Sequence, residues 1–131
     1  MRSFERAGVS IKRVTRGALP RAPFIRLRDA VLGKKYKLSV VFAGSARLRK
    51  LNHLYRKKNK PTDILAFSIS PREGELIISL TEVGKKARQF GRTYRSYFTY
   101  LIIHGLLHLK GLSHGSKMTS KERALERRFL P

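Results

Sequence analysis

The sequence predicts an α+β domain in which a small mixed sheet of about four strands is covered by about five helices. Two observations lead to this fold class: strand-like segments are grouped early in the chain, and segments with helical spacing are grouped late. The chain has 131 residues and no cysteine, which is enough for one hydrophobic core without disulfides. No internal repeat or linker interrupts the pattern, so we expect one domain over residues 1–131.

The earlier part of the chain alternates between helical and extended patterns. Apolar residues at helical spacing over residues 23–33 predict a short amphipathic helix. Residues 36–42 alternate and then become continuously apolar, which is typical of a strand in a partly covered sheet. Gly44-Ser45 suits a turn and N-cap, and the helix that follows continues as far as a basic loop at residues 56–61.

Two strands and three helices complete the prediction. Residues 62–69 and 75–79 are strand-like, and the Pro and Gly between them favour a short turn. Helical spacing then predicts one helix from Thr81 to Gly91 and a longer one over residues 94–110. Thr119, with Glu122 three residues later, has the pattern of a capping box that begins a last helix, ending near Leu130.

Three of the four histidines lie in the segment HGLLHLKGLSH, residues 104–114. Residues four apart on a helix share a face, so His104 and His108 can bind one ion. Gly111 then lets the chain reverse, which brings His114 toward the other two. Three imidazoles that leave a fourth position for water are typical of a catalytic zinc site, whereas structural sites have four protein ligands. We therefore expect one metal site, in a cleft.

The alternative interpretation is that these histidines have only a structural role. A single histidine on an apolar helix is usually a buried residue with a satisfied hydrogen bond, and His-x-x-x-His pairs also occur by chance. The third histidine beyond a glycine favours the metal site. The isolated His53 is expected to be a solvated helix residue.

The net charge of +22 is the second strong signal, from 30 Lys and Arg against 8 Asp and Glu. Such a charge destabilises the compact state by self-repulsion, and a polyanionic partner relieves it. The basic residues are spread along the whole chain, which favours a nucleic-acid partner for the folded surface. The alternative is a general charge bias of the proteome or adaptation to salt.

No segment of the sequence predicts a membrane protein. The longest apolar stretch, residues 97–109, is too short to span a bilayer, and the amino-terminal residues do not resemble a signal peptide. We therefore expect a cytoplasmic protein without a membrane partner.

Two segments together resemble the YbeY endoribonuclease family. Residues 51–67, LNHLYRKKNKPTDILAF, match that family's pattern LNxxYRxKxxPTDVLSF, and residues 104–114 match its HGxLHLxGxxH. Between them, GELIIS at residues 74–79 resembles its strand GDIxIS. The resemblance covers about residues 36–130, in the right order and spacing.

Some positions depart from the family pattern. The family usually has Tyr-Asp before the third histidine, where this chain has Leu112 and Ser113. Ala66 and Ser68 replace a serine and a proline of the strand motif, and the turn at residues 70–74 is shorter than the family's acidic loop. A carboxylate that orients a metal-binding imidazole is worth 10–100-fold in metal affinity or activity. The sequence predicts that this help is missing here.

The resemblance implies a fold, a reaction and a set of site residues. It implies a metal-dependent endoribonuclease specific for single strands, acting in ribosomal RNA processing, such as maturation of the 3′ end of 16S-type RNA, and in ribosome quality control. It implies one Zn²⁺ per chain on His104, His108 and His114, with Arg56 as the catalytic group that binds the phosphate. The basic run adds RNA contacts from Arg56, Lys57, Lys58 and Lys60. Implied partners are single-stranded or ribosomal RNA and the ribosome or its proteins.

Asp63, at a loop-to-strand junction, is expected either to cap the turn or to orient the site, with the structural role favoured. Two other functions compete with the nuclease. A metalloprotease would share the His-x-x-x-His spacing, but its general base directly follows the first histidine, where this chain has Gly105. The stronger rival is a non-catalytic RNA- or ribosome-binding module with a structural metal, which the missing acid at Ser113 and the extreme charge favour.

Overall fold

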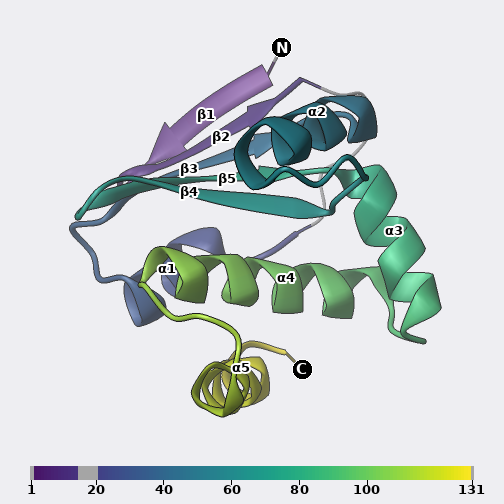
Figure 1. Ribbon diagram of the computed structural model, residues 1–131. Helices are drawn as coiled ribbons and strands as arrows, with labels where there is room; N and C mark the ends of the chain where they lie inside the picture. The colour runs from purple at the N-terminus through teal and green to yellow at the C-terminus, as the bar shows by residue number, and fades with distance from the viewer. Residues whose placement is uncertain (1, 15–20, 131) are drawn as a thin grey trace.

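A computed structural model describes residues 2–14 and 21–130, and Figure 1 shows a mixed sheet with helices on both of its faces. The fold class is confirmed, and the sheet has five strands rather than about four. The strands are β1 (Arg2–Arg6), β2 (Val9–Arg13), β3 (Lys37–Phe42), β4 (Ile64–Ser70) and β5 (Glu73–Ile78). The helices are α1 (Phe24–Val31), α2 (Ser45–Arg56), α3 (Leu80–Gln89), α4 (Tyr94–Leu109) and α5 (Ser116–Phe129).

The strands missed by sequence reasoning are β1 and β2, which form an antiparallel hairpin at one edge of the sheet. Their turn places Ala7 and Gly8 at φ 50° and 79°, and Ala7 gives no sequence signal for such a turn. The buried guanidinium of Arg28 on α1 donates to the carbonyl oxygens of Ala7 and Tyr36, at 2.7 and 2.6 Å. The hairpin is therefore fixed by tertiary hydrogen bonds.

The strand order is β1-β2-β3-β5-β4. The three inner strands run parallel, with Val40 of β3 opposite Ile11 of β2 and Leu76 of β5. The last strand, β4, returns antiparallel to β5, with Ile64 opposite Ile78. This return places the start of β4 beside the end of β5, where α3 and the long α4 follow.

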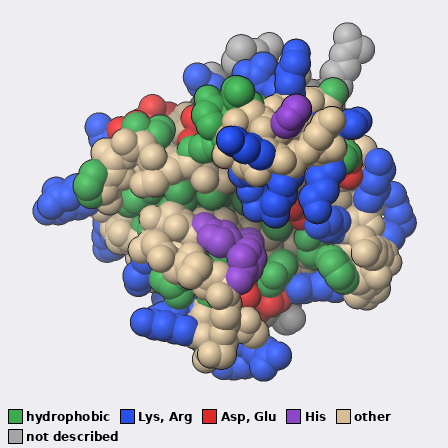
Figure 2. Space-filling model, in the orientation of Figure 1, with side chains coloured by type: hydrophobic (Ala, Val, Ile, Leu, Met, Phe, Trp, Pro, Cys, Tyr) green, Lys and Arg blue, Asp and Glu red, His purple; other side chains and the backbone are tan. Residues whose placement is uncertain are grey.

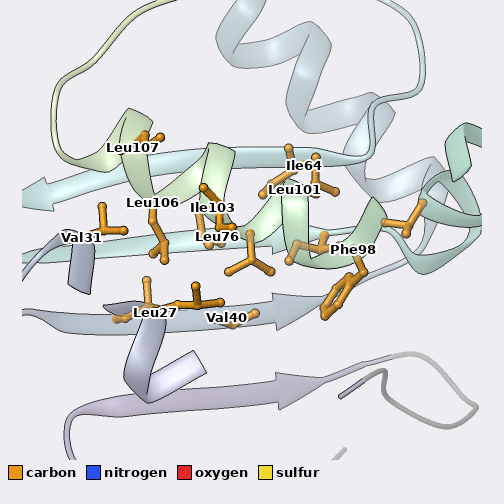
Figure 3. Packing of buried hydrophobic residues seen from close by; sticks show 14 of the residues in the cluster. Leu27, Val31, Val40, Ile64, Leu76, Phe98, Leu101, Ile103, Leu106 and Leu107 are labelled. Atoms are coloured by element: carbon orange, nitrogen blue, oxygen red, sulfur yellow. The ribbon is translucent and has the colours of Figure 1, made fainter. Parts of the chain in front are cut away.

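Most of the core lies between one face of the sheet and α4, which crosses that face (Figure 1). Figure 3 shows apolar side chains of α4 packed toward the strands and α1, among them Phe98, Leu101, Ile103 and Leu106 near Val40, Leu76 and Leu27. On the opposite face α2 covers a smaller cluster of Ala43, Leu48, Leu65 and Ile77. Helix α5 lies against α4 on the side away from the sheet (Figure 1). Helix α4 is consequently covered on two sides.

Gly105 allows α4 to lie unusually close to the sheet. A Cβ at this position would lie 2.8 Å from a methyl of Ile64 and 2.9 Å from one of Leu76, closer than side-chain packing permits. Both neighbours are buried in the core. Gly105 directly follows His104, so the helical turn that carries this histidine packs closely on the sheet.

The helix positions agree with the sequence within a few residues, except at two caps. Ser45 is not an N-cap: Gly44 takes that position, and the Ser45 hydroxyl donates to Glu82 at 2.9 Å. The capping-box prediction at Thr119 is wrong, because α5 begins at Ser116, with Gly115 as N-cap. The Glu122 side chain therefore does not serve as part of a helix cap.

Candidate metal centre

The carboxyl end of α4 is built to reverse the chain. Gly111 has φ 105°, its N–H donates to the His108 carbonyl at 2.9 Å, and the Leu112 N–H donates to Leu107 at 3.0 Å. These two bonds satisfy carbonyl groups of the last helical turn and form a Schellman motif. The reversal predicted at Gly111 is confirmed, and it returns His114 toward the helix.

The three predicted histidines do come together. One ring nitrogen from each of His104, His108 and His114 lies within 4.8 Å of the other two. His104 Nε2 and His108 Nε2 are 3.1 Å apart, and the His114 ring centroid lies 5.1 and 5.0 Å from those of His104 and His108. Helix α4 thus supplies two rings, and the loop before α5 supplies the third.

Glu122 of α5 contacts this cluster from behind. Its Oε2 lies 2.5 Å from His104 Nδ1, and its side chain is largely buried. The contact uses Nδ1 for the carboxylate and leaves His104 Nε2 facing the other histidines. The prediction that no carboxylate orients an imidazole here is therefore wrong: the carboxylate comes from α5 rather than from position 113.

The surroundings of His108 favour its neutral form. Burial lowers its pKa below the usual value, and the nearby rings of His104 and His114 and the charge of Arg56 lower it further, while a hydrogen bond with the Leu112 backbone acts in the opposite direction. A lowered pKa keeps the imidazole neutral to lower pH. Neutral imidazole is the form that binds metal.

The histidines open into a cleft of about 770 Å³. Figure 2 shows a cluster of histidine side chains at the surface, with hydrophobic and basic side chains beside it. Arg56, the last residue of α2, lines this cleft from the opposite wall, and its charge reaches His108. The structure therefore places the predicted arginine and the predicted histidines at one site.

The predicted lysines do not share this position. Lys57 caps α2 in a left-handed conformation and lines a different hollow, together with Arg47, Lys50 and Leu54. Lys58 and Lys60 are exposed in the basic loop and do not line the cleft. His53 is exposed on α2, as expected.

Comparison with known proteins decides the family. A family model described as Endoribonuclease YbeY matches residues 20–130 of this chain. The chain belongs to this family. Two of the segments that resemble the YbeY patterns meet at the site. Residues 104–114 carry the histidine cluster, and residues 51–67 include the facing end of α2.

Several curated relatives are also named Endoribonuclease YbeY. The relative from Chelativorans sp. (strain BNC1) is 34% identical over 71% of this chain and 63% of its own length, and that from Thermodesulfovibrio yellowstonii is 35% identical over 71% and 64%. The chain therefore spans less than two thirds of the length of these two relatives. A third, from Pelotomaculum thermopropionicum, is 30% identical over 92% of this chain and 84% of its own length.

A solved structure supports the fold. A protein of Thermotoga maritima, known from a solution structure, is 21% identical and superposes with a TM-score of 0.57 over 91% of this chain and 87% of that one. At this identity the likeness concerns the fold alone.

The three histidines have the donor set of a zinc site, and the pair on α4 also has its spacing. Two nitrogen ligands at the Zn–N distance of a tetrahedral ion lie roughly 3.3 Å apart, and His104 Nε2 and His108 Nε2 are 3.1 Å apart. The Glu122–His104 contact matches the carboxylate–histidine arrangement that fixes the tautomer and orientation of metal-binding imidazoles. The residues present therefore fit such an ion.

Sequence reasoning missed Glu122, Lys86 and the aromatic lining of the cleft. Glu122 lies on the same face of α5 as Met118 and Leu125, and an acid within an apolar stripe is a usable signal for a buried partner. No signal of that kind marks Lys86, which reaches the cleft only because α3 packs beside α4.

At the floor of the cleft, the hydroxyl of Tyr97 donates to Asp63 Oδ2 at 2.6 Å, and both side chains are buried. Burial, and then the bond to Asp63, raise the pKa of Tyr97. The Asp63 carbonyl also accepts from the Ser79 N–H at 2.9 Å. Asp63 thus ties the start of β4 to α4 and to the end of β5, which agrees with the structural role favoured from sequence.

Proposed function

We propose that this chain is a metal-dependent endoribonuclease that cleaves single-stranded RNA, with one Zn²⁺ per chain on His104, His108 and His114. The observation that carries the proposal is the convergence of three imidazole nitrogens within 4.8 Å at the end of a cleft that Arg56 lines. When bound, the ion supplies a Lewis acid beside the phosphodiester and lowers the pKa of water toward 7.

Arg56, Glu122 and the overall charge have separate roles in this proposal. Arg56 presents a planar fork of donors that suits two hydrogen bonds to one phosphate, and it holds the scissile group beside the histidines. Glu122 accepts from His104 Nδ1 and keeps His104 Nε2 directed at the cluster. The net charge of +22 attracts the polyanionic strand.

Ribosomal RNA is the proposed natural substrate. Family membership supports a role in processing the 3′ end of 16S-type RNA and in ribosome quality control. The ribosome or its proteins are then partners, and the cytoplasm is the compartment. No helix within residues 2–14 and 21–130 has the length and hydrophobicity needed to cross a membrane.

The structure disfavours the protease and weakens one argument for the binding module. A protease of the zincin type needs a glutamate at position 105, and there any Cβ would displace the buried methyl groups of Ile64 and Leu76. The non-catalytic RNA-binding module drew support from the missing acid at Ser113. Glu122 removes part of that support, because it supplies a carboxylate to the cluster by another route.

A cleavage assay on end-labelled single-stranded RNA, with zinc-loaded protein, tests the proposal. Arg56→Ala should slow cleavage about 10²-fold or more, the order found when one preorganised donor is deleted. Its RNA affinity should fall much less, because many other cations contribute to binding. The same sequence held in a duplex should be cut far more slowly.

Lys57→Ala is the matched control, since Lys57 is adjacent, carries the same charge and lines a different hollow. It should lower affinity slightly and leave the rate at saturating protein unchanged. Equal losses for the two variants, through binding alone, would make Arg56 a part of the basic surface only. If zinc-loaded wild type cleaves no RNA, the binding-module function is correct.

A further inference from the structure

Two aromatic side chains that line the cleft are unusually exposed. Tyr55 is 63% exposed and Phe90 is 57% exposed, although rings of this size are normally buried. They reach the cleft from different elements: Tyr55 is in the last turn of α2, beside Arg56, and Phe90 is the C-cap of α3. Their apolar faces are thus available to a molecule that enters the cleft.

Each exposed ring is held by a second aromatic ring that is better buried. Tyr55 lies edge-on to Phe67, with 5.3 Å between centroids and 69° between planes. Phe90 lies 5.8 Å from the ring of Tyr97, which is itself fixed by its hydrogen bond to Asp63. This backing restricts the two exposed rings, so a flat ligand can stack on them at a lower entropic cost.

A cation accompanies each ring within the same cleft. Arg56 follows Tyr55 directly, and Lys86 lies one helical turn before Phe90 on α3. Asp63 is the one acidic residue among the lining residues described, and its carboxylate is occupied by Tyr97. Paired rings and cations suit a ligand that alternates flat bases with negative phosphates, which is the chemistry of an unpaired nucleic-acid strand.

The rings also give the cleft a direction. From Phe90 at the end of α3, and then along α4 through Tyr97, Tyr100 and His104, successive ring centroids are each 5.8 Å apart. The cleft therefore leads from the histidine cluster toward the amino end of α4, with Tyr55 on the facing wall. A strand whose phosphate lies at the histidines can continue along this row.

We propose that Tyr55 and Phe90 form two nucleobase subsites, which stack unpaired bases of the strand beside the cleaved bond. This inference rests on the proposed function for the position of the scissile phosphate. Stacking accepts any base, because every base has a π-face, but it requires the base to be free of a duplex. The subsites thus select for unpaired strands without selecting for sequence.

The salt dependence of RNA binding distinguishes stacking on these rings from general electrostatic attraction. Replacing either ring with alanine changes no charge, so the slope of log K against log salt concentration should stay as in wild type. The affinity itself should fall about tenfold for each ring, within the range found for removing one stacked base.

The experiment follows binding and cleavage in the same samples. Fluorescence anisotropy and gel analysis of a labelled single-stranded oligoribonucleotide are recorded with zinc-loaded wild type, Tyr55→Ala, Phe90→Ala and Tyr55→Phe. Leu54→Ala is the matched control, because Leu54 is 69% exposed next to Tyr55 but does not line the cleft. A second oligonucleotide, with abasic riboses near the cleavage position, keeps every phosphate and removes the bases.

Both alanine variants should bind the intact strand about tenfold more weakly, and they should match wild type on the abasic strand. Tyr55→Phe, which keeps the ring, should bind like wild type. Melting followed by circular dichroism confirms that the variants are folded. The inference is overturned if both alanine variants behave like Leu54→Ala, or if Tyr55→Phe loses as much affinity as Tyr55→Ala.

The same data keep the two proposals apart. Weaker binding by the alanine variants in a protein that never cleaves RNA would support the subsites and reject the nuclease function. Normal binding by both variants in a protein that cleaves RNA would reject the subsites and keep the nuclease.

Discussion

The two walls of the cleft differ in how they are held. The wall formed by α4 packs between the sheet and α5, and Glu122 of α5 contacts His104 directly. The facing wall includes Tyr55 and Arg56 at the end of α2, and both of these side chains are exposed. The basic loop that follows is exposed as well, and its residues 57–61 lie outside the cleft. Metal ligands need fixed geometry, whereas attraction of a polyanion needs only charge near the strand. Rigid packing is accordingly concentrated on the wall that carries the histidines.

The largest effect is expected from His108→Ala, which changes the wall of the cleft that carries the histidines. The variant should lose nearly all of the one Zn²⁺ expected per chain, because two imidazoles hold zinc far more weakly than three. Most of the fold should remain, since His108 lies at the cleft rather than in the core. Elemental analysis after dialysis measures the metal, and circular dichroism checks the fold. Unchanged metal content would reject the site.

A smaller effect is expected from the contact behind the α4 wall. Glu122→Gln removes the carboxylate charge at His104 Nδ1 and should weaken zinc binding by about 10–100-fold. Competition with a chromogenic chelator measures the affinity. Glu126→Gln is the control, because Glu126 lies on the same helix but pairs with Arg92. Equal losses in both variants would mean that α5 acts through general stability rather than through His104.

The smallest effect is expected from the basic loop that follows Arg56, and it concerns RNA affinity rather than zinc binding. Replacing Lys57, Lys58 and Lys60 with alanine should lower RNA affinity uniformly and reduce the salt slope by roughly 0.7 for each lost phosphate contact. The zinc content should not change. The control is the same replacement at Lys34, Lys35 and Lys37, which are also exposed but lie at or just before the start of β3 rather than directly after Arg56. If both triple variants show the same reduction of the salt slope, the charge attracts RNA to the whole surface with no preference for the basic loop beside Arg56.

Sequence reasoning succeeded where the structure follows from local rules. The spacing of His104 and His108, and the reversal at Gly111, depend on helical geometry and on a left-handed glycine, so both could be predicted. The approach of Arg56 to the histidines came only from the family pattern. The hairpin of β1 and β2 was missed because Arg28 of α1 stabilises its turn.

The prediction of the site was incomplete because it lacked contacts between segments that are distant in the sequence. Glu122 reaches His104 only through the packing of α5 on α4, and its apparent role in a local cap was misleading. Tyr55 and Phe90 share the cleft only because α2 packs on β4 and α3 packs on α4. Contacts between distant segments depend on how whole elements pack, which a local pattern does not encode.

The three histidines lie within eleven consecutive residues, 104–114, and this has a consequence for folding. An unfolded chain keeps such close ligands together, so it also binds the ion, and binding to the unfolded state reduces the stabilisation that a ligand gives. Zinc should therefore stabilise the fold by less than its affinity for the native protein implies. In return, an ion held by His104 and His108 fixes one helical turn, which is the unfavourable first step of helix formation. Metal capture can thus begin the helix around which the rest of the chain packs.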